Sequence, residues 1–414
     1  MRLGVLGERN FGLLFFGQAA SAFGDRLAPI ALAFAVLDLT RSASDLGFVL
    51  AAQTLPMLLL VAVAGVWADR LPRQLVMLSS DVVRCASQGA TAALLLLGQA
   101  RIWQLIVLQA VYGAADAFFT PAMTGLIPAT AGAARLREAN ALMSLSRSAV
   151  GVAGPAVGGA LVAFLTPGVA LAGDAATFAI SAISLALLRL ERPPRTATGA
   201  SVLSELREGV AEVRERSWLW VMILYFGAFN ILVFPPFLVL GPYLAKHSLG
   251  GPGAWAAILT GGSAGFVAGS LLAVRVGASR PLFWGELACS LSALPSLFLG
   301  ISLPVATIVA VTFLRGVGLA WADALWHTTM QQHVPERALS RVSALDWTGT
   351  LVLNPIGFAI VGPVAAGVGA RATLIGSSVL TAVATLAVLA APSVRNLRVE
   401  PRPPPRDPAE PELL

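Results

Sequence analysis

The chain has 414 residues, of which 57% are hydrophobic and only 12% are charged, and its formal net charge is +6. Its mean hydropathy is +0.78. A soluble domain carries about a quarter charged residues, so this composition excludes a protein whose whole surface faces water. The two cysteines, Cys85 and Cys289, fall in apolar tracts and are too few for a disulfide framework. The sequence therefore predicts an integral membrane protein.

Long apolar stretches follow one another along most of the chain. A membrane-spanning α-helix needs about 20 predominantly apolar residues. Stretches of this kind lie at 11–38, 44–67, 75–98, 102–124, 139–164, 168–189, 218–244, 253–275, 281–300, 303–326, 342–367 and 371–391. We therefore predict an all-α polytopic membrane protein with twelve transmembrane helices. The N-terminal segment lacks the cleavage pattern of a removable signal peptide.

The longest polar stretch, residues 190–217, divides the predicted spans into two sets of six. We expect an N-terminal half over 1–189, a cytoplasmic central loop over 190–217 with a short amphipathic helix, and a C-terminal half over 218–391. The proline-rich, polar tail 392–414 is predicted to be disordered. These boundaries give two six-helix halves.

Positive charge is sorted between the two sides of the membrane. Most of the 28 cationic residues fall in loops on the side of the N-terminus, and the opposite loops hold only Arg41, Arg101, Lys246 and Arg371. Cytoplasmic loops carry an excess of Lys and Arg. Both termini are therefore predicted to be cytoplasmic.

Two related segments lie half a chain length apart. "ADAFFTPAMTGLIP" covers 115–128 and "ADALWHTTMQQHVP" covers 322–335, each at the inner end of the fourth span of its half. Halves with parallel topology, related by an axis along the membrane normal, are a known transporter architecture. The repeat predicts that Asp116 and Asp323 occupy comparable positions at the inner side.

The repeat also carries expectations about partners and helix ends. Each acid could reach a basic residue of a cytoplasmic loop, or it could only pin its own loop. Pro128 and Pro335 are expected to end their helices, because the residue before a proline is biased away from the helical region. The candidate basic partners are Arg135, Arg137, Arg337 and Arg341.

The loop after the second predicted span reads "GVWADRLPRQ" and contains Gly65, Asp69, Arg70 and Arg73. A glycine lets two helices approach closely, and an aspartate near a helix N-terminus is stabilised by the exposed amides there. The loop resembles the signature G-x-x-x-D-R-x-G-R-[RK] of the major facilitator superfamily, with departures at the second glycine and the last basic position. The resemblance implies a latch that closes the inner gate; a simple topogenic turn is the alternative.

The fifth predicted span contains "GVAGPAVGGA", with Gly151, Gly154, Pro155, Gly158 and Gly159. Glycines four residues apart form a groove for a neighbouring helix, and the proline removes one backbone hydrogen bond. The pattern resembles the antiporter motif of drug-exporting members of the superfamily. The groove can serve a moving gate or a static helix contact, and we favour the gate.

Other segments resemble a narrower group of bacterial exporters, which includes the enterobactin and macrolide exporters. They are "FFTPAMTGLIP", "REANAL" and "GPAVGG" around the fourth and fifth spans, "GDAATFAISA" at 173–182, and "MQQHVPERALSRVSAL" at the tenth-to-eleventh loop. This resemblance implies a cavity lined by spans 1, 4, 7 and 10. It also implies export of a drug, an antibiotic or a siderophore-like metabolite.

Charged residues inside the predicted spans are candidates for function, because a charge at the bilayer centre costs roughly 2.5–3.5 kcal/mol on insertion scales. Asp81 and Arg84 are three residues apart and can pair on one helix face. The charges that we consider on this ground are Asp25, Arg26, Asp81, Arg84, Asp116, Arg147, Asp174, Arg315 and Asp323.

Asp25 lies about halfway through the first span, and its neighbour Arg26 points about 100° away around the helix. We therefore choose Asp25, Asp116, Arg147 and Arg315 as proton-coupling candidates. The alternative is that Asp25 or Asp116 is simply ion-paired to one of these two arginines.

The seventh span offers an aromatic segment, "FGAFNILVFPPF". From it we choose Asn230 and Phe234 as candidates for the wall of a substrate cavity. Packing against lipid is the alternative reading of the same residues.

These features predict a proton-coupled antiporter of the bacterial plasma membrane that exports a hydrophobic small molecule by alternating access. Its partners would be the small-molecule substrate, protons and the bilayer, and it would act as a monomer. The sequence has no P-loop, H-E-x-x-H, G-x-S-x-G or Cys/His cluster, so we expect no enzyme activity, cofactor, metal or nucleic acid. The alternatives are uptake of a small nutrient, or a non-transporting sensor or lipid-handling protein on the same fold.

Overall fold

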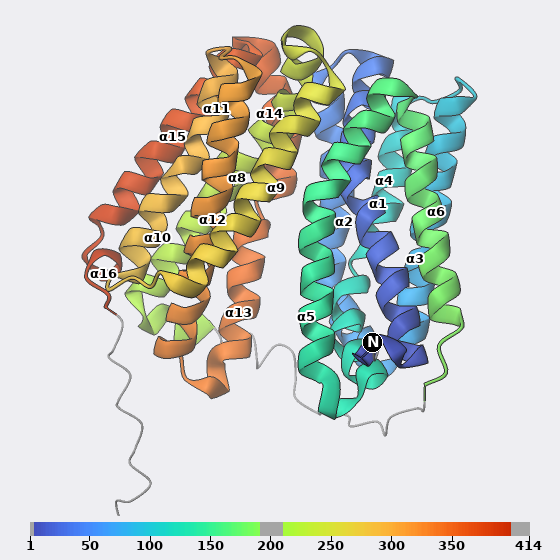
Figure 1. Ribbon diagram of the computed structural model, residues 1–414. Helices are drawn as coiled ribbons and strands as arrows, with labels where there is room; N and C mark the ends of the chain where they lie inside the picture. The colour runs from blue at the N-terminus through green and yellow to red at the C-terminus, as the bar shows by residue number, and fades with distance from the viewer. Residues whose placement is uncertain (1–3, 191–209, 399–414) are drawn as a thin grey trace, which may run out of the picture.

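The computed structural model describes residues 4–190 and 210–398, apart from some side chains within its helices. All regular secondary structure in these ranges is helical, which confirms the all-α prediction. Figure 1 shows two helical bundles side by side, one from each half of the chain. Most of the predicted central loop and most of the predicted tail lie outside the described residues, so the expectations for them stay predictions.

The first bundle contains six long helices. Ser42 caps the second helix by accepting a hydrogen bond from the Asp45 amide at 3.2 Å, and Thr166 caps the sixth from the Val169 amide at 3.3 Å. The helices are α1 (Arg9–Thr40), α2 (Ala43–Arg70), α3 (Arg73–Leu96), α4 (Ile102–Asp116), α5 (Phe119–Phe164) and α6 (Pro167–Ala186), preceded by the short η1 (Gly4–Gly7).

The second bundle contains the same number of spans, two of them segmented. The ninth is built from α10 (Pro281–Cys289), η3 (Ser290–Ser292) and α11 (Ala293–Gly300), and the eleventh from α13 (Glu336–Leu351) and α14 (Asn354–Val368). The other elements are α8 (Ser217–Leu244), η2 (Ala245–Leu249), α9 (Pro252–Arg275), α12 (Val305–His333), α15 (Ala370–Ala390) and α16 (Pro392–Arg395).

Ten helices in the described residues are long and apolar enough to cross a membrane, or eleven when the bent pair of α4 and the start of α5 counts as one span. The 24-residue α3 has the length to span but carries Arg73, Asp81 and Arg84. With α3 included, the helices correspond to the twelve predicted spans.

The fourth span differs from the prediction. Its first helix ends at Asp116, a new helix starts at Phe119, and this helix runs on through Pro128 to a kink at Gly132, where φ is 65°. The expectation that Pro128 ends a helix is therefore wrong: a proline removes only one backbone hydrogen bond, and spans tolerate this where neighbours compensate. The matching expectation for Pro335 is confirmed, since α12 ends at His333 and Pro335 is the N-cap of α13.

The two bundles meet most closely at the end of the molecule away from the N-terminus (Figure 1). There, α2 packs against α14 through glycines: a Cβ added at Gly362 would lie 2.3 Å from the Cα of Ser44, and one at Gly47 would lie 2.3 Å from the carbonyl oxygen of Phe358. At the same end, Lys246 Nζ lies 2.5 Å from Asp38 Oδ1 across the bundles.

The buried apolar residues follow the same division. One cluster is shared by both bundles and joins Leu37 and Leu46 to Trp255 and Phe358. The other two clusters each belong to one bundle. The bundles therefore share a core towards one end and have separate cores elsewhere. Such an arrangement would allow the bundles to rotate relative to each other about the shared end.

Gly362→Leu should separate the bundles at the shared core, because the new side chain would collide with the backbone at Ser44. In a background without native cysteines, maleimide labelling of Ala51→Cys on α2 should rise several-fold. Gly367→Leu, on the same helix with nothing within 4 Å of an added Cβ, is the control and should leave labelling unchanged. Equal labelling in both variants would show that this contact does not hold the bundles together.

Candidate functional site

The inner face of α3 is polar, which reverses the pattern of a water-soluble protein. Its buried polar residues recur every three or four positions, whereas apolar residues such as Val82 and Leu75 are exposed. Such an order fits a helix whose outer face meets lipid and whose polar side chains must find partners inside the bundle. The buried polar residues are Ser80, Asp81, Arg84, Ser87, Gln88 and Thr91.

Hydroxyl groups on this face attach α3 to its neighbour α4. Ser80 donates to the carbonyl of Ala115 at 2.8 Å, and Ser87 donates to the carbonyl of Leu108 at 2.6 Å. These bonds fix the depth of α3 relative to α4, so the arginine between the two serines is held at a defined level.

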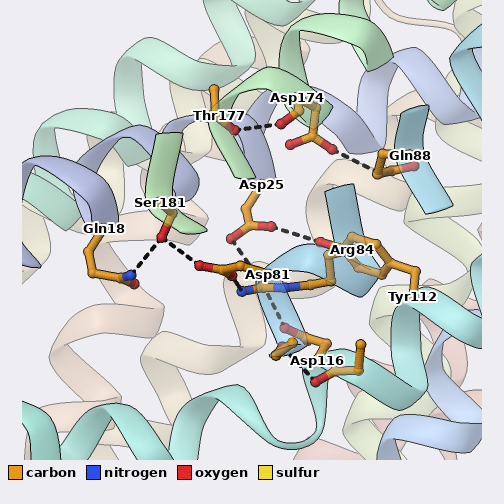
Figure 2. Close-up of polar contacts among 12 residues, drawn as sticks. Gln18, Asp25, Asp81, Arg84, Gln88, Tyr112, Asp116, Asp174, Thr177 and Ser181 are labelled. Carbon is orange, nitrogen blue, oxygen red and sulfur yellow. Dashed lines mark hydrogen bonds and ion pairs between the residues drawn. The ribbon is translucent and has the colours of Figure 1, made fainter. Parts of the chain in front are cut away.

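That residue is Arg84, whose buried guanidinium contacts three carboxylates from three helices (Figure 2). Its Nη2 donates to Asp81 on the same helix. Its Nη1 donates to Asp116 Oδ1 at the end of α4 at 3.1 Å and lies 3.9 Å from Asp25 Oδ2 of α1. One cation therefore joins α1, α3 and α4.

Aromatic rings complete the surroundings of the guanidinium. Arg84 Cζ lies 4.3 Å from the ring centre of Phe119 and 4.5 Å from that of Phe178. Cation–π contacts of this kind strengthen when water is excluded. The hydroxyl of Tyr112, on α4, donates to Asp25 Oδ1 at 2.8 Å, so Asp25 has a neutral donor as well as a cation beside it.

Hydrogen bonds extend the cluster to α6. Ser181 donates to Asp81 Oδ2 at 2.5 Å and accepts from the Gln18 amide at 2.9 Å (Figure 2). Each carboxyl oxygen of Asp81 thus has a donor, from Arg84 or from Ser181, and these contacts hold the guanidinium in place.

A second acid of α6, Asp174, lies in an adjoining uncharged network. It is buried and accepts from the Gln88 amide at 2.8 Å, while Gln109 donates to Gln88 Oε1 at 3.2 Å. Its other carboxyl oxygen, Oδ1, has no hydrogen-bond partner among the described residues. Burial of a carboxyl oxygen without a hydrogen-bond partner is costly, so this network is only partly satisfied within the described residues.

Accessibility separates the carboxylates into two kinds. The side chains of Asp25 and Asp116 are 35% and 30% exposed, whereas that of Asp81 is fully buried. A single guanidinium carries one positive charge beside three carboxylates. Asp25 and Asp116 are the two of these acids whose side chains are partly exposed.

The predicted pair of Asp81 and Arg84 is confirmed, but Arg84 does more than pair locally. Asp25 and Asp116 contact Arg84 rather than Arg147 or Arg315, the partners considered from the sequence. Arg147 has an exposed side chain on α5, and Arg315 belongs to the other bundle. The regular spacing of polar residues along α3 is the feature of the sequence that indicates this cluster around Arg84.

The repeat does not give the second acid an equivalent environment. Asp323 is 56% exposed on the continuous helix α12 and lies 3.6 Å from His327 of the same helix. Asp116 is held by Arg84, and Arg135 instead contacts Glu8 at 3.4 Å. The expected pairing of Asp116 with a loop arginine is therefore replaced by pairing inside the bundle.

In the second bundle, Arg315 of α12 faces aromatic residues of α8. Its Cζ lies 5.3 Å from the ring centres of both Phe234 and Phe237, and its Nε has no hydrogen-bond partner among the described residues. Asn230 donates to the carbonyl of Phe226 one turn earlier. Phe234 and Arg315 thus lie together, whereas the Asn230 amide is bonded to its own helix.

The sequence analysis did not consider two buried acids that lie within predicted spans. Glu286 of α10 is 3% exposed and its Oε2 has no partner among the described residues, while Asp346 of α13 accepts from the indole of Trp326 at 3.0 Å. Both lie inside apolar stretches predicted to span the membrane, 281–300 and 342–367, so the sequence alone was enough to identify them as candidates.

The antiporter-type glycines make two kinds of contact. Added Cβ atoms at Gly154 and Gly158 would collide with Arg26 and Leu27 of α1, and one at Gly159 would lie 2.0 Å from the Cβ of Ala256 in the other bundle. Gly151 has nothing within 4 Å of this position, and Pro155 is buried beside Gly154. The motif joins α5 to α1 and, one residue on, to α9.

The loop motif is only partly described. The surroundings of Gly65 and the side chains of Asp69 and Arg70 lie outside the described set, so the latch stays a prediction. The guanidinium of Arg73 lies against Gly125 of α5, where an added Cβ would meet it.

The family model of the Major Facilitator Superfamily matches residues 14–357, and the chain belongs to this superfamily. It is 26% identical over 402 residues to the multidrug efflux pump Tap of Mycobacterium tuberculosis (strain ATCC 25618 / H37Rv), covering 94% of this chain and 95% of that one. It is 22% identical over 244 residues to macrolide efflux protein A of Streptococcus pyogenes, covering 58% and 60%.

Solved structures share the fold at low sequence identity. An inward-facing, unoccupied bacterial homologue of the human lysosomal transporter Spinster has a TM-score of 0.72 at 16% identity, covering 95% of this chain and 99% of that one. The nucleoside transporter NupG has a TM-score of 0.72 at 12% identity, covering 94% and 99%. The expected resemblance to bacterial drug exporters is confirmed, and the protein is a multi-pass membrane transporter of this superfamily.

Arg84→Met should destabilise the protein strongly, because it leaves buried carboxylates without their cation. Breaking a buried ion pair costs about 3–5 kcal/mol, which should appear as a clear loss of melting temperature in detergent. Arg147→Met removes an exposed arginine of α5 and should change the melting temperature little. Similar losses in the two variants would mean that Arg84 is not the structural centre of the first bundle.

Proposed function

We propose that this protein is a proton-coupled antiporter that exports an apolar small molecule across a bacterial plasma membrane. The observation that carries the proposal is the pair of partly exposed carboxylates, Asp25 and Asp116, which share the buried guanidinium of Arg84. The relatives named as multidrug and macrolide efflux proteins support the direction of transport and the substrate class.

Proton binding at Asp25 would weaken the link between α1 and the two helices behind it. The ionised carboxylate is held by Arg84 of α3 and by the Tyr112 hydroxyl of α4. A neutral carboxyl keeps the hydrogen bond but loses the charge attraction. The guanidinium retains Asp81 and Asp116, so α1 becomes freer to move while α3 and α4 stay joined.

The glycine motif offers a route from this proton site to the contact between the bundles. Arg26 and Leu27, which directly follow Asp25, pack against Gly154 and Gly158 of α5. Gly159 of the same helix packs against Ala256 of α9. A shift of α1 would therefore be transmitted through α5 to the interface between the bundles. This supports the interpretation of the glycine motif as part of a moving gate.

Alternating access would follow from rocking of the two halves, 1–189 and 218–391, about their shared core. In the proposed orientation both termini are cytoplasmic, so the present contact through Lys246 and Asp38 closes the outer side. Asp69 and Arg70 would close the inner side in the opposite state. A monomer contains every part of this cycle.

The second bundle supplies the proposed substrate wall. Phe234 and Phe237 present ring faces, and Arg315 lies over both of them. Large apolar surfaces with a few polar groups are typical of small-molecule sites. An aromatic drug would stack on the partly exposed ring of Phe234, beside the buried Nε of Arg315 and the buried Phe237.

Asp25→Asn should uncouple transport from the proton gradient, because the amide mimics the protonated carboxyl and cannot release a proton. In inside-out vesicles, an acidified lumen should drive accumulation of a fluorescent drug by the wild type and fail to do so in the variant. Downhill exchange of the drug should persist, since the fold and the substrate wall are intact.

Asp45→Asn, in the first turn of α2, is the matched control and should keep gradient-driven accumulation. Wild-type accumulation in Asp25→Asn at equal expression would remove this residue from the coupling mechanism. Accumulation in right-side-out rather than inside-out vesicles would favour uptake of the substrate instead of export.

Phe234→Ala should raise the KM for drug efflux by roughly tenfold, which corresponds to about 1.4 kcal/mol. The physical reason is the loss of ring area against the substrate and of a face beside Arg315. Proton-gradient dependence should remain. Phe164→Ala, at the exposed end of α5, should leave KM unchanged; an unaltered KM in Phe234→Ala would assign the ring to packing.

A further inference from the structure

A basic pocket of about 420 Å³ lies at the start of α10. It is lined by Ser279, Arg280, Phe283, Trp284 and Arg398. Two guanidinium groups and no acid contribute to its wall. Within the described part of the chain, neither Arg280 nor Arg398 has an ion pair or a hydrogen bond from its side chain. Among the described residues, the positive charge of this pocket therefore has no acidic partner.

The surroundings favour a bound anion at the level of the membrane interface. The pocket lies at the N-terminus of α10, where Pro281 opens the helix and the helix dipole adds positive potential. Trp284 is 44% exposed beside the two arginines. Tryptophan is enriched at the height of lipid headgroups, with its ring towards the hydrocarbon and its N–H towards water.

A second, apolar groove of about 360 Å³ runs along the same helices. It lies between the ninth span and α15, and its wall includes Leu287, Leu294, Leu297, Leu386 and Leu389. Leu287 is one turn beyond Trp284, and Leu389 is close to the end of α15, from which the chain leads to Arg398.

The basic pocket and the apolar groove belong to one flank of the molecule. Figure 1 places α10, α11, α15 and α16 together at the edge of the second bundle, away from the first. In the membrane this edge is covered by lipid. The basic pocket is lined by the start of α10 and by Arg398, which follows α16, and the lining of the groove runs from Leu287 of α10 to Leu297 of α11.

We propose that this flank binds one anionic phospholipid. Arg280 and Arg398 hold its phosphate, Trp284 packs at the level of the glycerol, and one acyl chain lies in the groove between the ninth span and α15. Bidentate guanidinium groups are well suited to phosphate oxygens, and basic pockets on the cytoplasmic side of helix bundles bind lipid headgroups. The apolar groove that continues from the basic pocket distinguishes a lipid from a soluble phosphate.

The headgroup arm of the test uses the full-length protein in detergent with added phosphatidylglycerol, followed by native mass spectrometry. The wild type should retain one lipid, with much weaker retention of phosphatidylcholine, whose headgroup has no net charge. Arg280→Gln combined with Arg398→Gln should weaken binding by at least about tenfold, the loss expected for charge-assisted contacts. Arg395→Gln, an exposed arginine outside the pocket, is the control and should retain the lipid.

The acyl-chain arm separates a lipid from a free anion. Ala382→Trp, which fills the groove, should also weaken retention of phosphatidylglycerol, whereas Ala387→Trp, exposed on α15 outside the groove, should not. Unchanged retention in the double arginine variant would overturn the proposal. So would displacement of the lipid by millimolar inorganic phosphate together with unchanged binding in Ala382→Trp, because that result assigns the pocket to a soluble phosphate.

Discussion

The first bundle depends on one buried guanidinium. An arginine inside a membrane protein is costly unless it is paired, and Arg84 has three carboxylates within 4 Å. Because these acids come from α1, α3 and α4, and because Asp81 is bonded onward to Ser181 of α6, the requirement to satisfy one charge fixes four helices relative to one another. The same requirement leaves two partly exposed carboxylates, Asp25 and Asp116, with less than a full counter-charge, and the proposed proton site is placed there for this reason.

Contacts between the bundles follow a different physical rule. Lipid is as apolar as leucine, so helices in a membrane associate through close packing rather than through the hydrophobic effect. Gly47 and Gly362 permit such packing at the end away from the termini, and Gly159 permits it beside α9. These contacts involve few charges, with Lys246 and Asp38 at the margin. An interface of this kind can separate without exposing many unpaired polar groups, as a rocking transporter needs.

The two halves of a duplicated fold have diverged in chemistry. The first holds the carboxylate cluster, while the second holds Arg315 against Phe234 and Phe237 and leaves Asp323 on an exposed helix face. Proton exchange and substrate contact would thus fall to different bundles, joined by helix packing through α5. The outer flank of the second bundle carries a third feature, the paired basic pocket and apolar groove, which concerns the surrounding lipid and not the transported molecule.

The sequence by itself determined the all-α membrane fold, the correspondence to twelve spans, the superfamily and the pair of Asp81 and Arg84, because hydropathy, charge bias and short motifs are local properties of the chain. It did not determine that span 4 breaks after Asp116 instead of ending at Pro128, since neighbouring helices decide whether a proline is tolerated. It suggested Asp25 and Asp116, but the partners that it offered for them as alternatives, Arg147, Arg315 and the loop arginines, did not include Arg84, and it overlooked Glu286 and Asp346. Which arginine meets which acid depends on the rotation and depth of helices distant in sequence, and only tertiary packing sets those.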